Sequence, residues 1–175
     1  MSGAASWSFR EEDAARIGAL LDRLLAESSA RTALLVDRAG QMLATAGQAP
    51  QFDPITFATL TAADFSANDQ LARLLGENEF GALFHQGEKD SLYLADVARR
   101  VILVVLFDHT TTLGLVKLRV RGIVGDLSRV FADMFAREGA GGGGGGGATG
   151  SGRAVEGGFV GEAEDEIDRL FGGPA

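Results

Sequence analysis

The chain has 175 residues, 46% of them hydrophobic, and a formal net charge of −8 at pH 7, which suits one folded domain and argues against nucleic acid as a partner. It contains no cysteine, so disulfides, thiolate zinc sites and a cysteine nucleophile are excluded. Residues 1–5 lack the pattern of a signal peptide and no apolar run reaches membrane-spanning length, so we expect a soluble, cytoplasmic protein.

The first expected elements are a helix and a hairpin. Ser8 and Glu11 have the spacing of a capping box, in which each residue's side chain satisfies a free backbone amide at a helix start. The helix is predicted over about residues 9–27, with an apolar stripe of Ile17, Leu20, Leu21, Leu24 and Leu25. Two strands are predicted at 32–37 and 42–46, joined by a short turn.

A second helix is predicted to begin after Asp53, whose carboxylate suits an N-cap and is followed by Pro54 at the first helical position. It should run to about Leu75 and stop at Gly76. At about 100° per residue this middle helix has two apolar faces. One face carries Leu60, Ala67, Leu71 and Leu74, and the opposite face carries Ala58, Ala62, Phe65 and Ala72.

This two-sided pattern permits two interpretations. A surface helix with one buried face should be polar on the other side, and Asp69 and Arg73 supply only part of that polarity. From the residues alone, the second face is either covered inside the core or free to contact another helix or another protein.

Three more strands are predicted at 80–86, 91–98 and 101–107. The last one consists of seven consecutive apolar residues between Arg100 and Asp108. Its length and its β-branched residues favour a strand buried on both faces over a piece of buried helix. We expect this strand to be the one around which the other elements are organised.

A long helix is predicted from Thr112. Residues 116–121 also alternate as a strand would, but an apolar stripe of helical spacing continues to Met134 and favours the helix. The stripe consists of Leu113, Val116, Val120, Ile123, Leu127, Val130 and Met134.

The composition changes after residue 138. Residues 139–158 include seven consecutive glycines, and this composition predicts a flexible linker. A phosphate-binding loop is excluded, because no Lys-Ser or Lys-Thr follows the glycines. Residues 159–175 form an acidic tail, in which a short amphipathic face is expected to dock on a partner through Ile167, Leu170 and Phe171. The predicted organisation is therefore a flexible N-terminus at 1–8, a domain at 9–138, the linker and the tail.

The order helix, two strands, helix, three strands, helix resembles the bacterial Roadblock family, in particular those members that act on a Ras-like small GTPase. The likeness covers about residues 9–137 and 162–171. The motifs that carry it are LVD at 35–37, GQ at 40–41, AGQ at 46–48, LTA at 60–62, LARLLGENEF at 71–80, FHQG at 84–87, KDSLY at 89–93, VVLFD at 104–108, LGLVKLR at 113–119 and IDRLF at 167–171.

The resemblance implies an α+β fold with a five-stranded antiparallel sheet, the first and last helices on one face and the middle helix on the other. It also implies a homodimer that pairs through the middle helix and the adjacent strand. The paired helices would contact a Ras-family GTPase and stimulate hydrolysis without inserting an arginine, in a complex concentrated at a cell pole. The interface residues expected on this basis are Ala58, Thr61, Ala62, Phe65, Asp69 and Ala72, and GTP and Mg would be bound by the partner.

A departure from the family pattern is the bulk and polarity that Phe65, Asp69 and Gln70 give to the middle helix. The alternative function is a scaffold that holds other proteins together without changing hydrolysis. An enzyme is not expected, because no nucleophile–base set, metal cluster or cofactor fingerprint is present.

The remaining polar residues favour structural or solvent-facing roles. His85 and His109 lack a carboxylate pattern typical of a metal site. Strand-end and turn roles are predicted for Asp90, Asp96 and Asp108, and a solvated helix face for Lys117, Arg119 and Arg121.

Overall fold

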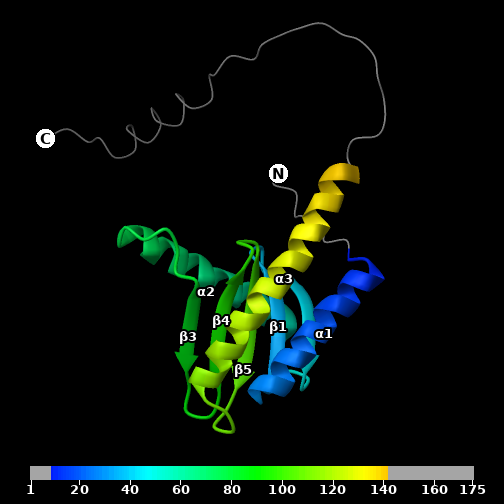
Figure 1. The fold of residues 1–175 in the computed structure, drawn as a ribbon. Coiled ribbons are helices and arrows are strands. Elements are labelled where there is room, and N and C mark those ends of the chain that lie inside the picture. Colours follow the sequence, from blue (N-terminus) through cyan, green and yellow to red (C-terminus); the bar gives the residue numbers. More distant parts are fainter. Residues whose placement is uncertain (1–8, 142–175) are drawn as a thin grey trace, which may run out of the picture. The chain divides into compact units, whose positions relative to one another are not determined.

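The computed structural model describes residues 9–141. Its elements, shown in Figure 1, are α1 (Glu11–Ser28), β1 (Thr32–Asp37), β2 (Met42–Gly47), α2 (Pro54–Leu74), β3 (Ala82–Gln86), β4 (Ser91–Val97), β5 (Val101–Phe107) and α3 (Leu113–Gly141). The predicted order of helices and strands is confirmed, and the strand-like alternation at 116–121 lies within α3.

The apolar run at 101–107 is the central strand of the sheet. The five strands are ordered β2-β1-β5-β4-β3, and every neighbouring pair is antiparallel. In the register, Val104 of β5 lies between Leu34 of β1 and Leu94 of β4. Six of the seven β5 residues are buried, which confirms a strand covered on both faces.

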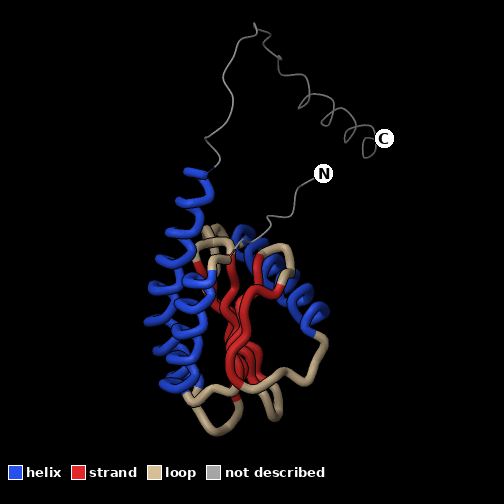
Figure 2. Tube along the Cα trace, turned by 90° about the vertical axis from the view of Figure 1, so that its right-hand side faces the viewer, coloured by secondary structure: helices blue, strands red, loops and turns tan. Residues whose placement is uncertain are grey.

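The two faces of the sheet are covered by different helices, as expected. Figure 2 shows α1 and α3 on one side of the sheet and α2 on the other. Leu103 and Val105 of β5 belong to the larger core beneath α1 and α3. Ile102 and Val104 belong to a smaller core beneath α2, to which the helix contributes Ala58 and Phe65. Alternation along one strand therefore supplies both cores.

Two predicted boundaries differ from the structure. The first helix begins at Glu11, close to the expected start, but Arg10 occupies the N-cap position without a side-chain cap, so the prediction of a Ser8 capping box is wrong. The last helix continues to Gly141 and includes the first residues of the predicted linker. Residues 142–175 lie outside the described residues, and with them the tail positions Ile167, Leu170 and Phe171.

An ion pair joins the beginning of α1 to the end of α3. The Asp13 side chain is buried, and Arg137 Nη2 donates to its Oδ2 at 2.5 Å. This hydrogen bond, with the charge of Arg137, holds the pKa of Asp13 below its ordinary value of 3.8. A buried carboxylate without its cation would be an uncompensated charge, and that is strongly destabilising.

We expect Arg137→Ala to lower the unfolding temperature at pH 7 by roughly 5–10 °C. Because the folded-state pKa of Asp13 is depressed, its carboxylate stabilises the fold above about pH 4 and loses this effect as the pH falls through the folded-state pKa. The difference between variant and wild type should therefore shrink towards pH 3. Calorimetry at several pH values measures this, with Arg129→Ala at an exposed ion pair as the control. A difference in unfolding temperature of the same size at pH 3 and pH 7 would contradict a stabilising role for the ion pair between Asp13 and Arg137.

Candidate interaction surface

The middle helix is held at both ends by local sequence signals. Asp53 Oδ2 accepts two hydrogen bonds from Thr56. The backbone N–H of Thr56 donates at 2.8 Å, and the Thr56 hydroxyl donates at 2.6 Å. These bonds lower the pKa of Asp53, and Pro54 begins the helix behind this cap. The helix ends at Leu74, and Gly76 has a φ of 78°, a left-handed conformation that favours glycine.

Large apolar side chains are exposed along the outer face of α2. Leu60 is 64% exposed, Leu71 56% and Leu74 83%, and Ile55 and Leu75 at the two ends of the helix are exposed as well. The spacing from Leu60 to Ala67, Leu71 and Leu74 places these residues in one stripe. Isolated exposed leucines are common on soluble proteins, whereas a continuous apolar stripe marks an interaction surface.

The residues predicted to meet a partner lie instead on the face that packs against the sheet. Ala58, Phe65 and Ala72 are fully buried, and Thr61 and Ala62 are 7% exposed. These five residues are therefore covered within the protomer, and the exposed face of α2 is the opposite one. The helical period sets the angle between the two apolar faces, but it does not say which of them turns to the sheet. The small alanines allow close approach to the sheet, and Phe65 fills the space above β1, β4 and β5.

Asp69, the remaining predicted interface residue, is bound within the protomer. Arg38 from the β1–β2 turn donates from Nη1 to Asp69 Oδ2 at 2.7 Å, and from Nη2 to Asp96 at the end of β4. The guanidinium also lies over the Phe65 ring, 4.5 Å from its centroid. Arg38 thus ties the C-terminal half of α2 to the β1–β2 turn and to the end of β4.

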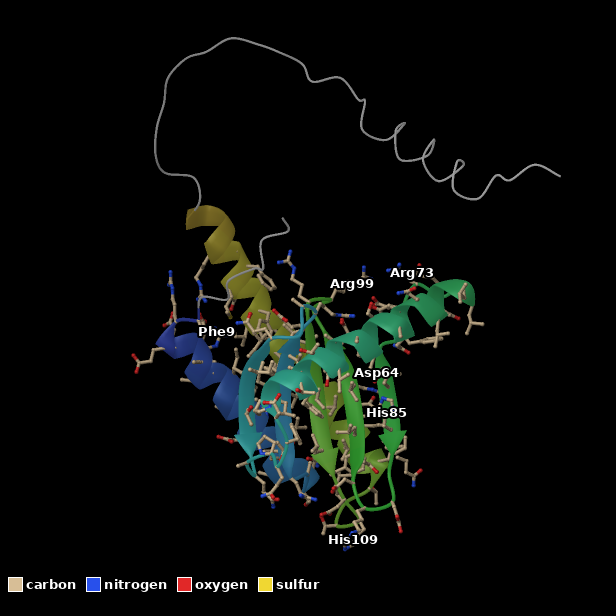
Figure 3. All side chains as sticks on the ribbon, turned by 180° about the vertical axis from the view of Figure 1, so that it is seen from behind. Phe9, Asp64, Arg73, His85, Arg99 and His109 are labelled. Atoms are coloured by element: carbon tan, nitrogen blue, oxygen red, sulfur yellow. The ribbon has the colours of Figure 1, made fainter. Side chains whose placement is uncertain are left out.

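A polar cleft of about 380 Å³ opens beside this cluster. Its walls come from α2, the loop after α2 and two turns of the sheet, and its lining residues are Arg38, Ala62, Ser66, Asp69, Arg73, Asn78, Glu79 and Arg99. Figure 3 shows Arg73 and Arg99 at the same end of the molecule. The α2 residues that line the cleft follow one another at spacings of three and four, so they share a side of the helix that is distinct from the apolar stripe.

Next to α2, one edge of the sheet is unpaired within the described part of the protomer. There β3 bonds only to β4, and Phe84 of β3 is 37% exposed. His85 of the same strand has its Nε2 2.7 Å from Asp64 Oδ2 on α2 (Figure 3). The outer face of α2 and the β3 edge thus form one continuous surface.

Residues 16–107 match the Roadblock/LC7 domain. The chain belongs to the Roadblock/LC7 family. The resemblance seen in the sequence is thereby confirmed, together with the Roadblock fold.

Solved structures similar to this Roadblock chain include several MglB proteins. Myxococcus xanthus MglB is 45% identical, with 67% of this chain and 96% of that chain covered and a TM-score of 0.65. The gliding protein MglB of Thermus thermophilus is 37% identical, with 73% and 97% covered and a TM-score of 0.67. An MglB structure with a tetrameric arrangement is 36% identical, with 75% and 99% covered and a TM-score of 0.70. Comparison with curated proteins gave no match.

The other polar residues singled out in the sequence are distributed over the Roadblock domain. Arg31 pairs with Asp90 at 2.5 Å and Asp108 at 3.6 Å. His109 is exposed at the opposite end of the domain from Arg73 and Arg99 (Figure 3). On α3, Lys117, Arg119 and Arg121 are exposed, and Arg119 pairs with Glu27.

Residues 9–141 contain no group of three or more His, Cys, Asp or Glu side chains that could hold a metal ion. In the same part of the chain, no helix is both long and apolar enough to span a membrane.

The Arg38 cluster is the feature of this Roadblock domain that sequence reasoning missed. A signal for it exists, because Asp69 follows Phe65 by four residues and so lies on the same side of α2. A carboxylate on the sheet-facing side requires a cation nearby. The sequence does not say which of its arginines supplies that cation.

Proposed function

We propose that this chain is a homodimeric regulator of a Ras-like small GTPase similar to MglA, acting in bacterial polarity or motility. It accelerates GTP hydrolysis by rearranging the GTPase's own catalytic residues and has no active site of its own. The observation that carries the proposal is the exposed apolar face of α2 on a Roadblock domain that is 45% identical to Myxococcus xanthus MglB. GTP and Mg belong to the partner.

The homodimer forms through the outer face of α2 and the unpaired edge of β3. Burying the leucines of the stripe against a second copy removes apolar surface from water. An open sheet edge offers free N–H and C=O groups to another strand. The tetrameric arrangement of an MglB that is 36% identical to this chain supports self-association.

Single-turnover GTP hydrolysis tests the proposal. The probes are the Ras-like GTPases of the source organism, each loaded with GTP and mixed with the full-length chain. A rise in the hydrolysis rate that saturates with the concentration of the chain is expected. Binding without any change in rate would instead make the chain a scaffold. No binding to any of these GTPases would overturn both functions.

We further expect that no single arginine acts as a catalytic finger. Arg38 is held by two carboxylates, and the exposed Arg100 lies 4.4 Å from the centroid of the Phe135 ring, so the candidates to test first are Arg73 and Arg99. An inserted arginine finger contributes about 10³–10⁵ to the rate. Arg73→Ala and Arg99→Ala should each lower the saturated rate by less than about tenfold, far below that contribution. A loss on the order of a thousandfold from either one, with binding intact, would contradict this mechanism.

A further inference from the structure

A carboxylate lies at the margin of the apolar stripe of α2, on the side that faces β3. Asp64 follows Leu60 by four residues and precedes Leu71 by seven, so the three side chains share one side of the helix. Leu60 and Leu71 are 64% and 56% exposed, and the Asp64 side chain is 41% exposed. A partner that covers these leucines therefore also removes the Asp64 carboxylate from water, which costs free energy unless a cation is paired with it.

The cation that can pair with this carboxylate comes from the edge strand. His85 of β3 has its Nε2 2.7 Å from Asp64 Oδ2, and Figure 3 shows the two side chains next to each other. Within residues 9–141, no lysine or arginine forms an ion pair with Asp64, and residues 61–68 of α2 carry no other charged side chain. The His85 side chain is 48% exposed, so the pair is open to solvent in a single protomer.

The other groups around His85 do not take over this role. In the register of the sheet, β4 places the apolar Leu92 opposite His85. The exposed turn after β3 carries one cation, Lys89, between the acidic residues Glu88 and Asp90. In the part of the chain that the structure describes, Lys89 forms no ion pair with the carboxylate on α2. The charge that compensates this carboxylate therefore depends on a proton on His85.

We propose that the homodimer covers the bridge between His85 and Asp64 and therefore takes up protons as it forms. A histidine gains its charge as the pH falls through the range from about 8 to 5. Protonated His85 compensates the carboxylate, whereas neutral His85 would leave a covered charge without a cation. The proton is thus held more firmly in the dimer than in the separate protomers. The added stability of the dimer is present at low pH and is lost as the pH rises through the histidine range.

The inference rests on the homodimer of the proposed function, and its test measures the dissociation constant of that dimer. Sedimentation equilibrium of the full-length chain is compared at about pH 5.5 and about pH 8.5, near the two ends of the histidine range. We expect the wild-type dissociation constant to be about tenfold lower at the acidic pH. His85→Gln should abolish this difference. His85→Lys carries its charge at both pH values and should give the tight dimer at both.

The chain offers a matched control, because it contains only two histidines. Acidification also reduces the net charge of −8, and His109 contributes to that change as much as His85 does. His109 is exposed at the opposite end of the domain from Arg73 and Arg99 (Figure 3). His109→Gln should therefore keep the wild-type difference between the two pH values. Measurement at physiological salt screens exposed charges farther apart than about 8 Å.

Asp64→Asn is expected to reverse the pH dependence. Without the carboxylate, a proton on His85 would itself be the uncompensated charge in the dimer, so this variant should dimerise more tightly at the alkaline pH.

Four results would overturn the inference while the proposed homodimer stands. They are equal wild-type dissociation constants at both pH values, a pH dependence that persists in His85→Gln, a pH dependence that disappears in His109→Gln, and the wild-type direction in Asp64→Asn. A wild-type chain that stays monomeric at micromolar concentration at both pH values is a failure of the proposed homodimer itself.

Discussion

Replacing Leu71 with Arg is expected to convert the homodimer into monomers without unfolding the protomer. Leu71 is 56% exposed in the protomer, so the longer side chain meets no core residue there. In the proposed dimer it would place a charge without a partner between two apolar helix faces. We expect the dissociation constant of the dimer to rise by at least about 100-fold.

Sedimentation equilibrium at micromolar concentration measures this change, and circular dichroism confirms that the fold is retained. Leu118→Arg is the matched control, because Leu118 is 59% exposed on α3, on the other side of the sheet. This variant should remain dimeric. A wild-type chain that is already monomeric at micromolar concentration, or equal dissociation of both variants, would refute the interface.

The second large effect is expected from Phe65→Ala, on the opposite face of the same helix. Phe65 is fully buried above the sheet, and its ring also lies beneath the Arg38 guanidinium. Removing it leaves a cavity in the small core under α2 and takes away the surface on which Arg38 rests. We expect a loss of about 3–5 kcal/mol in the free energy of unfolding.

Urea denaturation at a fixed protomer concentration tests this, because the stability of a dimer depends on concentration. The matched control is Phe135→Ala on α3, outside the proposed interface, where the ring is half-buried and stacks on Phe131 at a centroid distance of 6.4 Å. This control should lose no more than about 1.5 kcal/mol. Equal losses from the two variants would mean that Phe65 does not anchor α2.

Much of the fold could be predicted from the sequence because its signals are local. The seven-residue apolar run at 101–107 has no polar position that could face water, so it had to be buried on both faces. Asp53, Pro54 and Gly76 delimit α2 through backbone hydrogen bonding and φ preferences that act within a few residues. The capping box at Ser8 had the right residue types, but Arg10 occupies the N-cap.

The contacts that position the interaction surface depend on residues far apart in the chain. Arg38 meets Asp69 and Asp96, which are 31 and 58 positions away, and Arg137 meets Asp13 across 124 positions. Each arginine had several possible carboxylate partners, and only the packing of helices on the sheet selects among them. The cleft beside α2 is a product of the same packing, since four separate segments line it.

The orientation of α2 shows most directly where sequence information ends. The sequence by itself determined that this helix has two apolar faces, because the period of 3.6 residues places the stripe from Leu60 to Leu74 opposite the face formed by Phe65 and the alanines around it. Only the tertiary structure decided that Phe65 faces the sheet and Leu71 faces outward. Both side chains are apolar, so hydrophobicity alone does not choose between them. The choice follows from shape, because the alanines around Phe65 allow close approach to the sheet, and from Arg38, which pairs with the carboxylate of Asp69 on that side.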